Sequence, residues 1–187
     1  MSQLFSPLAI GPLSLPNRIV VAPMCQYSSI DGEASDWHVQ HWSNLALSGA
    51  GLVIVEATAV EPRGRISWAD LGLYDDATEA AFANALATVR RWSPAKMGVQ
   101  LAHAGRKAST LKPWEGGGGP IPADDARGWT TRAPSALPYA ETDPVPEALD
   151  DAGIAEIIQA FTDSAIRAVR LGLDLIEIHA AHGYLLH

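Results

Sequence analysis

The chain has 187 residues, enough for one globular domain with a sizeable core, and 48% of its residues are hydrophobic while 18% are charged. A net charge of −8 argues against nucleic acid or an anionic membrane as the main partner, because both require a basic surface. No apolar run approaches the roughly 20 residues of a membrane span, and the N-terminus lacks the pattern of a secretory signal. With a single cysteine, the sequence also excludes an internal disulfide, so we expect a cytoplasmic protein.

The first part of the chain predicts a hairpin and then a buried strand. Residues 5–16 are short apolar pieces broken by prolines and a glycine, which is typical of a tight turn pair. Residues 19–22 form a short apolar run that Pro23 ends, and the loop after it carries Met24, Cys25 and Tyr27. A lone cysteine is most often a small buried hydrophobe, and Tyr27 can serve as an aromatic cover for the end of a barrel.

The next unit predicts a helix followed by a second buried strand. The helix is expected over residues 37–48 with Asp36 as its cap, and it carries His38 and His41. These two imidazoles resemble a metal pair, but no acidic or cysteine partner is spaced to complete a site, so core hydrogen bonding is the better interpretation. The strand over residues 52–57 ends in small residues, and Ala57 there leaves room for a flat ligand.

A second helix and a third strand follow, and then a long polar segment. The helix is expected over residues 76–92 and the strand over 97–103. Gln100 is unusual in a buried strand, since its amide needs either backbone partners or a ligand with donor and acceptor edges. Residues 104–146 are too long for a simple connection, which suggests a lid or binding loop in preference to a loose surface excursion.

The last unit predicts a helix over residues 151–171, capped by Asp150, with apolar residues at spacings of three and four facing a sheet. A fourth buried strand follows, and polar chemistry begins where it ends, at His179, His182 and Tyr184. Two imidazoles and a phenol on one short loop are suited to holding and protonating a carbonyl compound. They also fit two other roles, an internal hydrogen-bonded pair and two ligands of a metal ion.

The order of these elements predicts parallel strands joined by right-handed crossovers. The residues with functional chemistry, His103 among them, all lie at or just after the carboxyl ends of strands, which is the face that carries active sites in a (β/α)8 TIM barrel. Only four of eight strands are present, so we interpret residues 1–187 as the N-terminal half of one barrel domain, with 104–146 as its lid. A flavodoxin-like domain is the less favoured alternative.

Short motifs in the same order along the whole chain resemble those of the Old Yellow Enzyme flavin reductases, in the subgroup of xenobiotic reductases and bacterial NADPH dehydrogenases. The matching motifs include Ala22-Pro23-Met24-Cys25-Gln26-Tyr27, Glu56-Ala57-Thr58-Ala59-Val60, Gln100-Leu101-Ala102-His103-Ala104-Gly105-Arg106-Lys107 and His179-Ala180-Ala181-His182-Gly183-Tyr184. Cys25 together with Tyr27 indicates this subgroup.

The resemblance implies an FMN enzyme that takes hydride from NADPH and passes it to the activated C=C bond of an unsaturated carbonyl or nitro compound. It implies that Ala22, Pro23, Met24, Cys25 and Ala57 line the flavin and that Gln100 binds its pyrimidine edge. Cys25 is expected to tune the flavin potential. His179 and His182 are expected to bind the substrate oxygen, Tyr184 to supply a proton, and Tyr27 to close over the ligand.

The ending departs from the family pattern, because the phosphate-binding loops of such barrels usually follow strands seven and eight. We therefore expect this chain to be a homo-oligomer or to need a missing C-terminal half, and to hold FMN poorly alone. Two other functions stay open at this level. One is a metal-dependent hydrolase with His179, His182 and His103 as ligands, and the other is an inactive half-barrel.

Overall fold

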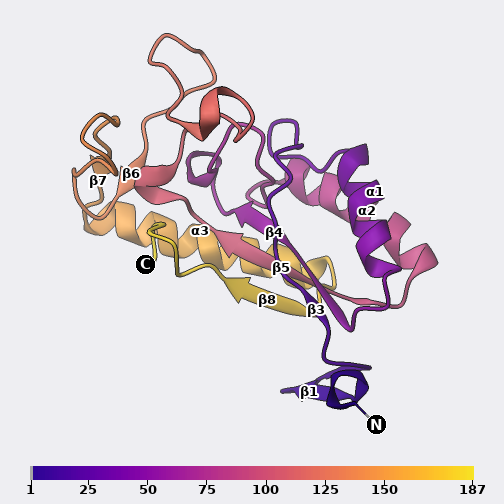
Figure 1. Cartoon of the computed structure of the whole chain (residues 1–187). Coiled ribbons are helices and arrows are strands. Elements are labelled where there is room, and N and C mark those ends of the chain that lie inside the picture. The colour runs from indigo at the N-terminus through magenta and orange to yellow at the C-terminus, as the bar shows by residue number, and fades with distance from the viewer. Residues whose placement is uncertain (1) are drawn as a thin grey trace.

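The computed structural model describes residues 2–187 and contains one four-stranded parallel sheet (Figure 1). Its strands are β3 (Val20–Val21), β4 (Leu52–Ala59), β5 (Lys96–Ala102) and β8 (Leu175–Ile178), in the spatial order β3-β4-β5-β8. Because every pair of neighbours is parallel, all four carboxyl ends lie at the same edge of the sheet. The expectation of four parallel strands is confirmed, and Met1, the first residue of the predicted domain, lies outside the described residues.

Three helices connect the strands, and they are α1 (Asp36–Ala46), α2 (Asp76–Trp92) and α3 (Asp151–Arg170). The cap of α1 was predicted one residue too late, because Ser35, and not Asp36, is the residue before the first helical turn. Helix α2 has the predicted bounds, since the Asp75 side chain accepts a hydrogen bond from the Thr78 N–H and fixes its start. Asp150 caps α3 as expected, by accepting from the Gly153 N–H.

The main core lies between the sheet and the helices. Val55, Val99 and Leu101 of the sheet meet Trp42 of α1 and Phe82 of α2, all of them buried. Alternation along the strands places the next residues on the opposite face, which would be the interior of a closed barrel. That inner face carries Leu52 and Ile54 of β4, Gln100 of β5, and Leu175 and Glu177 of β8.

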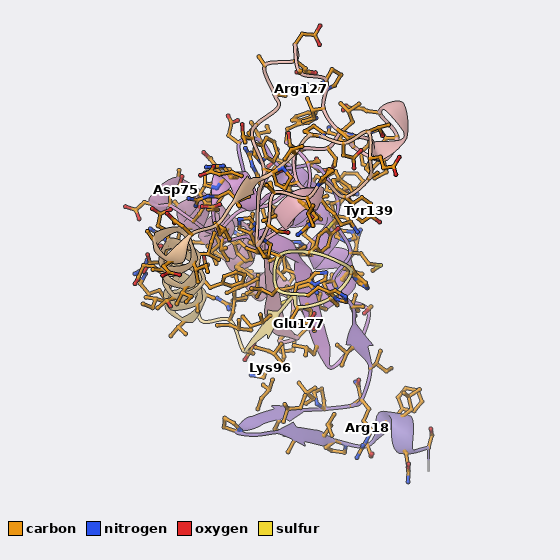
Figure 2. All side chains as sticks on the ribbon, turned by 90° about the vertical axis from the view of Figure 1, so that its left-hand side faces the viewer. Arg18, Asp75, Lys96, Arg127, Tyr139 and Glu177 are labelled. Carbon is orange, nitrogen blue, oxygen red and sulfur yellow. The ribbon has the colours of Figure 1, made fainter. Side chains whose placement is uncertain are left out.

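The N-terminal hairpin closes the amino end of the inner face. After a 3-10 turn (Gln3–Phe5), strands β1 (Leu8–Ile10) and β2 (Leu13–Leu15) pair antiparallel as expected from the broken apolar run. Leu15 is fully buried and packs on Leu52 and Ile54. The hairpin and the segment that holds Arg127 lie at opposite ends of the molecule (Figure 2), so the hairpin leaves the carboxyl ends of the strands free.

The sheet stops at β8, and this leaves part of α3 uncovered. Ile157 and Ala168 are buried, but Ile154 and Ile158, which were expected on the packed face, are exposed by 47% and 62%. The reason is that the sheet ends beside α3, so strand residues lie under only part of the helix's apolar surface. Val169 of α3 and Ile178 of β8 are exposed as well. No helix among residues 2–187 is long and apolar enough to cross a membrane.

Residues 104–146 form an irregular layer above the carboxyl ends of the strands (Figure 1). This layer contains two 3-10 turns (Gly105–Lys107 and Gly116–Gly118) and strand β6 (Arg132–Ala133), which pairs with β7 (Glu147–Ala148) beyond it. Trp129 Nε1 donates to the carbonyl oxygen of Arg63, which lies within the short turn Pro62–Gly64 that follows β4. Ile121 and Ala133 are buried, so the layer is packed against the rest of the fold.

Candidate functional site

The loop after β8 brings His179, His182 and Tyr184 into one aromatic cluster. The His179 ring centroid lies 5.1 Å from that of His182 and 5.0 Å from that of Tyr184, each in an edge-on arrangement. His182 has a φ of +61°, which a residue with a side chain rarely adopts, and Gly183 follows with a φ of +73°. The tight turn therefore folds the three side chains onto each other instead of spreading them along an extended chain.

Hydrogen bonds define how the two imidazoles are protonated. His179 Nδ1 accepts from the Ala181 N–H at 3.3 Å, so the proton of a neutral ring is on Nε2, which faces His182 Nδ1 at 3.3 Å. His182 then carries its own proton on Nε2. Burial lowers the pKa of His179, and the neighbouring His182 lowers it further, so His179 is neutral at physiological pH.

Lys107 joins this loop to the layer above it. Its ammonium donates to the His182 carbonyl oxygen at 2.8 Å and lies 4.8 Å from the ring centroids of both Tyr184 and Tyr139. The sequence placed Lys107 in the polar segment without assigning it a role. The only available signal was its position five residues after the end of β5, and that does not identify its partner on a loop 75 residues away.

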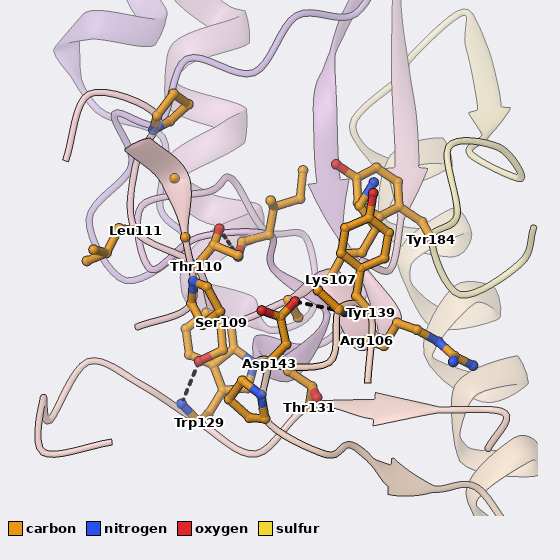
Figure 3. A pocket seen from close by; sticks show the side chains of 18 of the residues that line it. Arg106, Lys107, Ser109, Thr110, Leu111, Trp129, Thr131, Tyr139, Asp143 and Tyr184 are labelled. Atoms are coloured by element: carbon orange, nitrogen blue, oxygen red, sulfur yellow. Dashed lines mark hydrogen bonds between the residues drawn. The ribbon is translucent and has the colours of Figure 1, made fainter. Parts of the chain in front are cut away.

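A pocket of about 420 Å³ opens between this loop and the 104–146 layer. Tyr27, from the loop after β3, is one of the residues that line it. Tyr184 lines it from the loop after β8, and Lys107, Trp129 and Tyr139 line it from the layer (Figure 3). Its volume falls in the range of small-molecule sites, which are concave and mostly apolar with a few polar groups. Aromatic walls with one ammonium suit a planar, electron-poor compound.

The loop after β3 contributes Cys25 and Tyr27. Strand β3 is the edge strand at the opposite end of the sheet from β8. Burial raises the pKa of the Cys25 thiol well above the usual range, and the nearby carboxylates of Asp70 and Glu56 raise it further. The Tyr27 ring packs edge-on against Trp114 with centroids 5.8 Å apart. Pro23 is half-buried, whereas Ala22 and Met24 are exposed and border a small space against α1.

Gln100 has a partner that the sequence did not predict. Its Nε2 donates to Glu177 Oε1 on the neighbouring strand at 2.5 Å, which is neither of the two expected partners, the backbone or a ligand. Ala57 is the register partner of Gln100 on the other side. The inner face thus carries an amide beside a methyl group near the strand ends.

His103 belongs to the packing of the fold. Its Nδ1 accepts from the Gly105 N–H at 3.0 Å, and its Nε2 lies 2.9 Å from Glu61 Oε1. Both ring nitrogens are used internally, so His103 does not share a ligand with His179 and His182. Among residues 2–187, no three His, Cys, Asp or Glu side chains are arranged to hold a metal ion.

Asp70 is a further residue of this region that the sequence did not reveal. It is 2% exposed; Oδ2 accepts from the Ile66 N–H at 2.7 Å, and Oδ1 has no hydrogen-bond partner within residues 2–187. Burial raises the pKa of Asp70 to about 7. Its charge also acts on Cys25 and Tyr27. Burial raises the pKa of Tyr184 to about 12, with smaller contributions from Cys25 and Asp70.

Comparisons with known proteins all indicate the same family. Residues 3–187 match the model of the NADH:flavin oxidoreductase / NADH oxidase family. The chain is 43% identical to the NADPH dehydrogenase of Geobacillus thermodenitrificans over 98% of its own length and 49% of the relative's. It is 43% identical to an NADH:flavin oxidoreductase of Gibberella zeae over its full length and 45% of that protein.

Solved structures give the same result. The fold superposes on morphinone reductase with a TM-score of 0.81 at 30% identity, covering 97% of this chain and 49% of that one. An Old Yellow Enzyme from Pichia sp. superposes with a TM-score of 0.82 at 26% identity, over 98% of this chain and 47% of that one. The chain thus spans about half the length of the relatives it matches, and its fold is a partial (β/α)8 barrel.

Proposed function

The chain belongs to the NADH:flavin oxidoreductase / NADH oxidase family, and we propose that it supplies the substrate-protonating half of an FMN-dependent ene-reductase. The observation that carries this proposal is that Tyr27 and Tyr184 line one pocket at the carboxyl edge of the sheet, although their loops are about 160 residues apart in sequence. Gln100 lies on the strand between those loops. A reduced nicotinamide, NADPH by family expectation, is the proposed hydride source.

The residues at the strand ends fit a flat heterocycle on one side. Ala57 presents only a methyl group next to the Gln100 amide, which offers donor and acceptor atoms to a pyrimidine-like edge. We propose that Gln100 then exchanges its Glu177 contact for the flavin, and that residues 22–25 line the ring with backbone and the Cys25 thiol. When bound, the flavin supplies the hydride transfer, which protein side chains cannot perform.

The residues of this chain bind the substrate and move one proton. The substrate oxygen accepts hydrogen bonds from the Nε2–H groups of His182 and, after it turns from its partner, His179. These donors stabilise negative charge that develops on the oxygen as hydride reaches the β-carbon. The Tyr184 hydroxyl, with a pKa of about 12, keeps its proton at neutral pH and can give it to the α-carbon. Tyr27 covers the bound compound.

The aromatic pocket under residues 104–146 defines the proposed substrate class. We propose that this layer acts as a lid, with Tyr139 and Trp129 contacting planar α,β-unsaturated carbonyl or nitro compounds. Lys107 connects the lid to the loop of His182 through its hydrogen bond to the His182 carbonyl oxygen, so the lid and His182 become ordered together. A cytoplasmic location stays a prediction, and it rests on the single free thiol.

We propose that the partner of this half-barrel is a complementary C-terminal half. Two strand edges are open, with Val20 of β3 exposed by 41% and Ile178 of β8 by 49%. Open apolar edges favour pairing with further strands. A second copy of the chain is the alternative.

A metal-dependent hydrolase is not favoured, because the family match points to flavin chemistry and His103 is committed to Glu61 and Gly105. An inactive half-barrel is the remaining alternative, and the experiment below separates it from the proposed function.

The experiment mixes the purified chain with the separately produced C-terminal half of the Bacillus subtilis NADPH dehydrogenase, which is 41% identical to the chain where they align. With FMN and NADPH added, we expect bound-flavin absorbance and reduction of cyclohexenone by the mixture, and little of either by the chain alone. Tyr184→Phe should lower turnover at least tenfold while flavin absorbance stays. A mixture that binds FMN but reduces nothing would refute the assigned activity, and bound zinc in place of flavin would favour the hydrolase.

A further inference from the structure

An irregularity in β4 controls which way its last residues point. Val55 is paired with Val99 of β5, but Gln100, the next residue of β5, is paired with Ala57, so Glu56 is an extra residue in β4. Such a bulge re-aims side chains and is often found beside active sites. Here it keeps Val55 in the core under the helices and Ala57 beside Gln100, and it releases Glu56 from the regular alternation of the strand.

The released carboxylate reaches two other elements. Glu56 is 3% exposed, and its Oε2 accepts from the Gln26 backbone N–H at 2.5 Å. Its Oε1 lies 3.3 Å from His38 Nε2, on a ring that is completely buried in α1. His38 Nδ1 accepts from the Ser35 N–H at 2.9 Å, which holds the ring at the start of α1.

These contacts connect the start of α1 to the loop that carries Cys25 and Tyr27. Gln26 stands between those two residues, and Tyr27 has a φ of +50°, a conformation that persists only when its surroundings fix it. The core does not require an ionisable group at this position, since a buried carboxylate costs free energy unless it is paired. The placement of Glu56 is therefore better explained by what it holds.

We propose that Glu56 is a positioning residue that fixes the Cys25–Tyr27 loop at the carboxyl edge of the sheet. Four ionisable groups face the thiol or its neighbour Tyr27, and they are Glu56, Asp70, Tyr27 and Tyr184. After burial, the charges of Asp70 and Glu56 are the causes that raise the pKa of Cys25. That this loop faces a flavin rests on the proposed function, but the action of Glu56 on the loop does not.

The test uses the flavin-free chain, in which Cys25 is the only cysteine and reports alone on any thiol reagent. Its modification rate by a maleimide is measured from pH 6 to 10 for the unmodified chain, Glu56→Gln, Glu56→Asp and Glu33→Gln. Glu33 is an exposed carboxylate before α1, so it is the matched control. We expect Glu56→Gln to react about tenfold faster near pH 8, because removing a nearby like charge raises the thiolate fraction.

Glu56→Asp, which keeps the charge, should restore most of the slow reaction, and Glu33→Gln should stay within twofold of the unmodified chain. Equal acceleration in Glu56→Gln and Glu33→Gln, or none in Glu56→Gln, would overturn the proposal.

Hydrogen exchange of the Gln26 amide in the unmodified chain is a second measurement that needs no variant. Protection comparable to the β4 amides supports the proposal, and exchange as fast as an exposed loop overturns it. If the mixture with the separately produced C-terminal half fails to bind FMN while the thiol result is positive, only the proposed function is refuted.

Discussion

The buried carboxyl of Asp70 makes the stability of the fold depend on pH in a direction opposite to that of most acidic residues. Its pKa is about 7 in the folded chain against 3.8 for a free side chain, because burial disfavours the charged form more than the Ile66 N–H bond favours it. An acid with a raised pKa binds more protons in the folded state. Stability from this group is therefore complete below pH 4 and falls as the pH rises to about 7.

The size of the effect follows from the interval between the two pKa values. An interval of about 3 corresponds to on the order of 4 kcal/mol, of which about 3 kcal/mol falls between pH 5 and pH 8. Asp70→Asn keeps an acceptor for the Ile66 N–H and carries no charge. We expect the free energy of unfolding of this variant, relative to the unmodified chain, to increase by about 3 kcal/mol from pH 5 to pH 8.

Urea unfolding followed by circular dichroism at several pH values measures this difference directly. Other titrating groups are common to both chains and cancel in the comparison. Asp124→Asn is the control, because Asp124 is an exposed carboxylate in the polar layer of residues 104–146. If the free energies of unfolding of Asp70→Asn and of the unmodified chain change in parallel from pH 5 to pH 8, burial does not raise the pKa of Asp70 and the reasoning is refuted.

Three further substitutions test other parts of the structure. Asp75→Ala removes the cap of α2 and should cost about 1 kcal/mol of unfolding free energy, seen as a lower urea midpoint; no change would show that the cap is dispensable. Phe82→Ala should cost roughly 3–5 kcal/mol, because its ring is fully buried against Trp42; a cost under 1 kcal/mol would contradict the packing described for the core. Lys107→Met keeps the stem but loses the bond to the His182 carbonyl oxygen, so hydrogen exchange in residues 180–185 should accelerate several-fold, with exchange in β4 as the internal reference.

The sequence predicted most of the fold because the strong local signals agree. The bounds of α2 follow from an apolar periodicity that Asp75 and Thr78 frame with side-chain hydrogen bonds. The start of α1 was placed at the wrong residue, since Ser35 and Asp36 are both common caps and only the backbone distinguishes them. The exposed side of α3 was missed because periodicity reports an apolar face without showing what lies against it.

The site was predicted less completely, because its contacts join distant parts of the chain. The motifs indicated His179, His182 and Tyr184, and the structure brings these three together. The partner of Gln100 is 77 residues away on a neighbouring strand, and only the sheet register reveals it. Asp70 sits in an irregular loop, where neither periodicity nor a motif marks a buried carboxyl.

The central claim is that the loops after β3 and β8 and the end of β5 together form one surface for a flat heterocycle. The most direct measurement is a titration of the isotopically labelled chain with FMN at millimolar concentration, followed by amide chemical shifts. We predict that the shifts of Cys25, Ala57, Gln100, His182 and Tyr184 move together while those of Leu8–Leu15 in the N-terminal hairpin stay in place. Shifts that move at the hairpin, or between α1 and α2, without movement at the strand ends would contradict the claim.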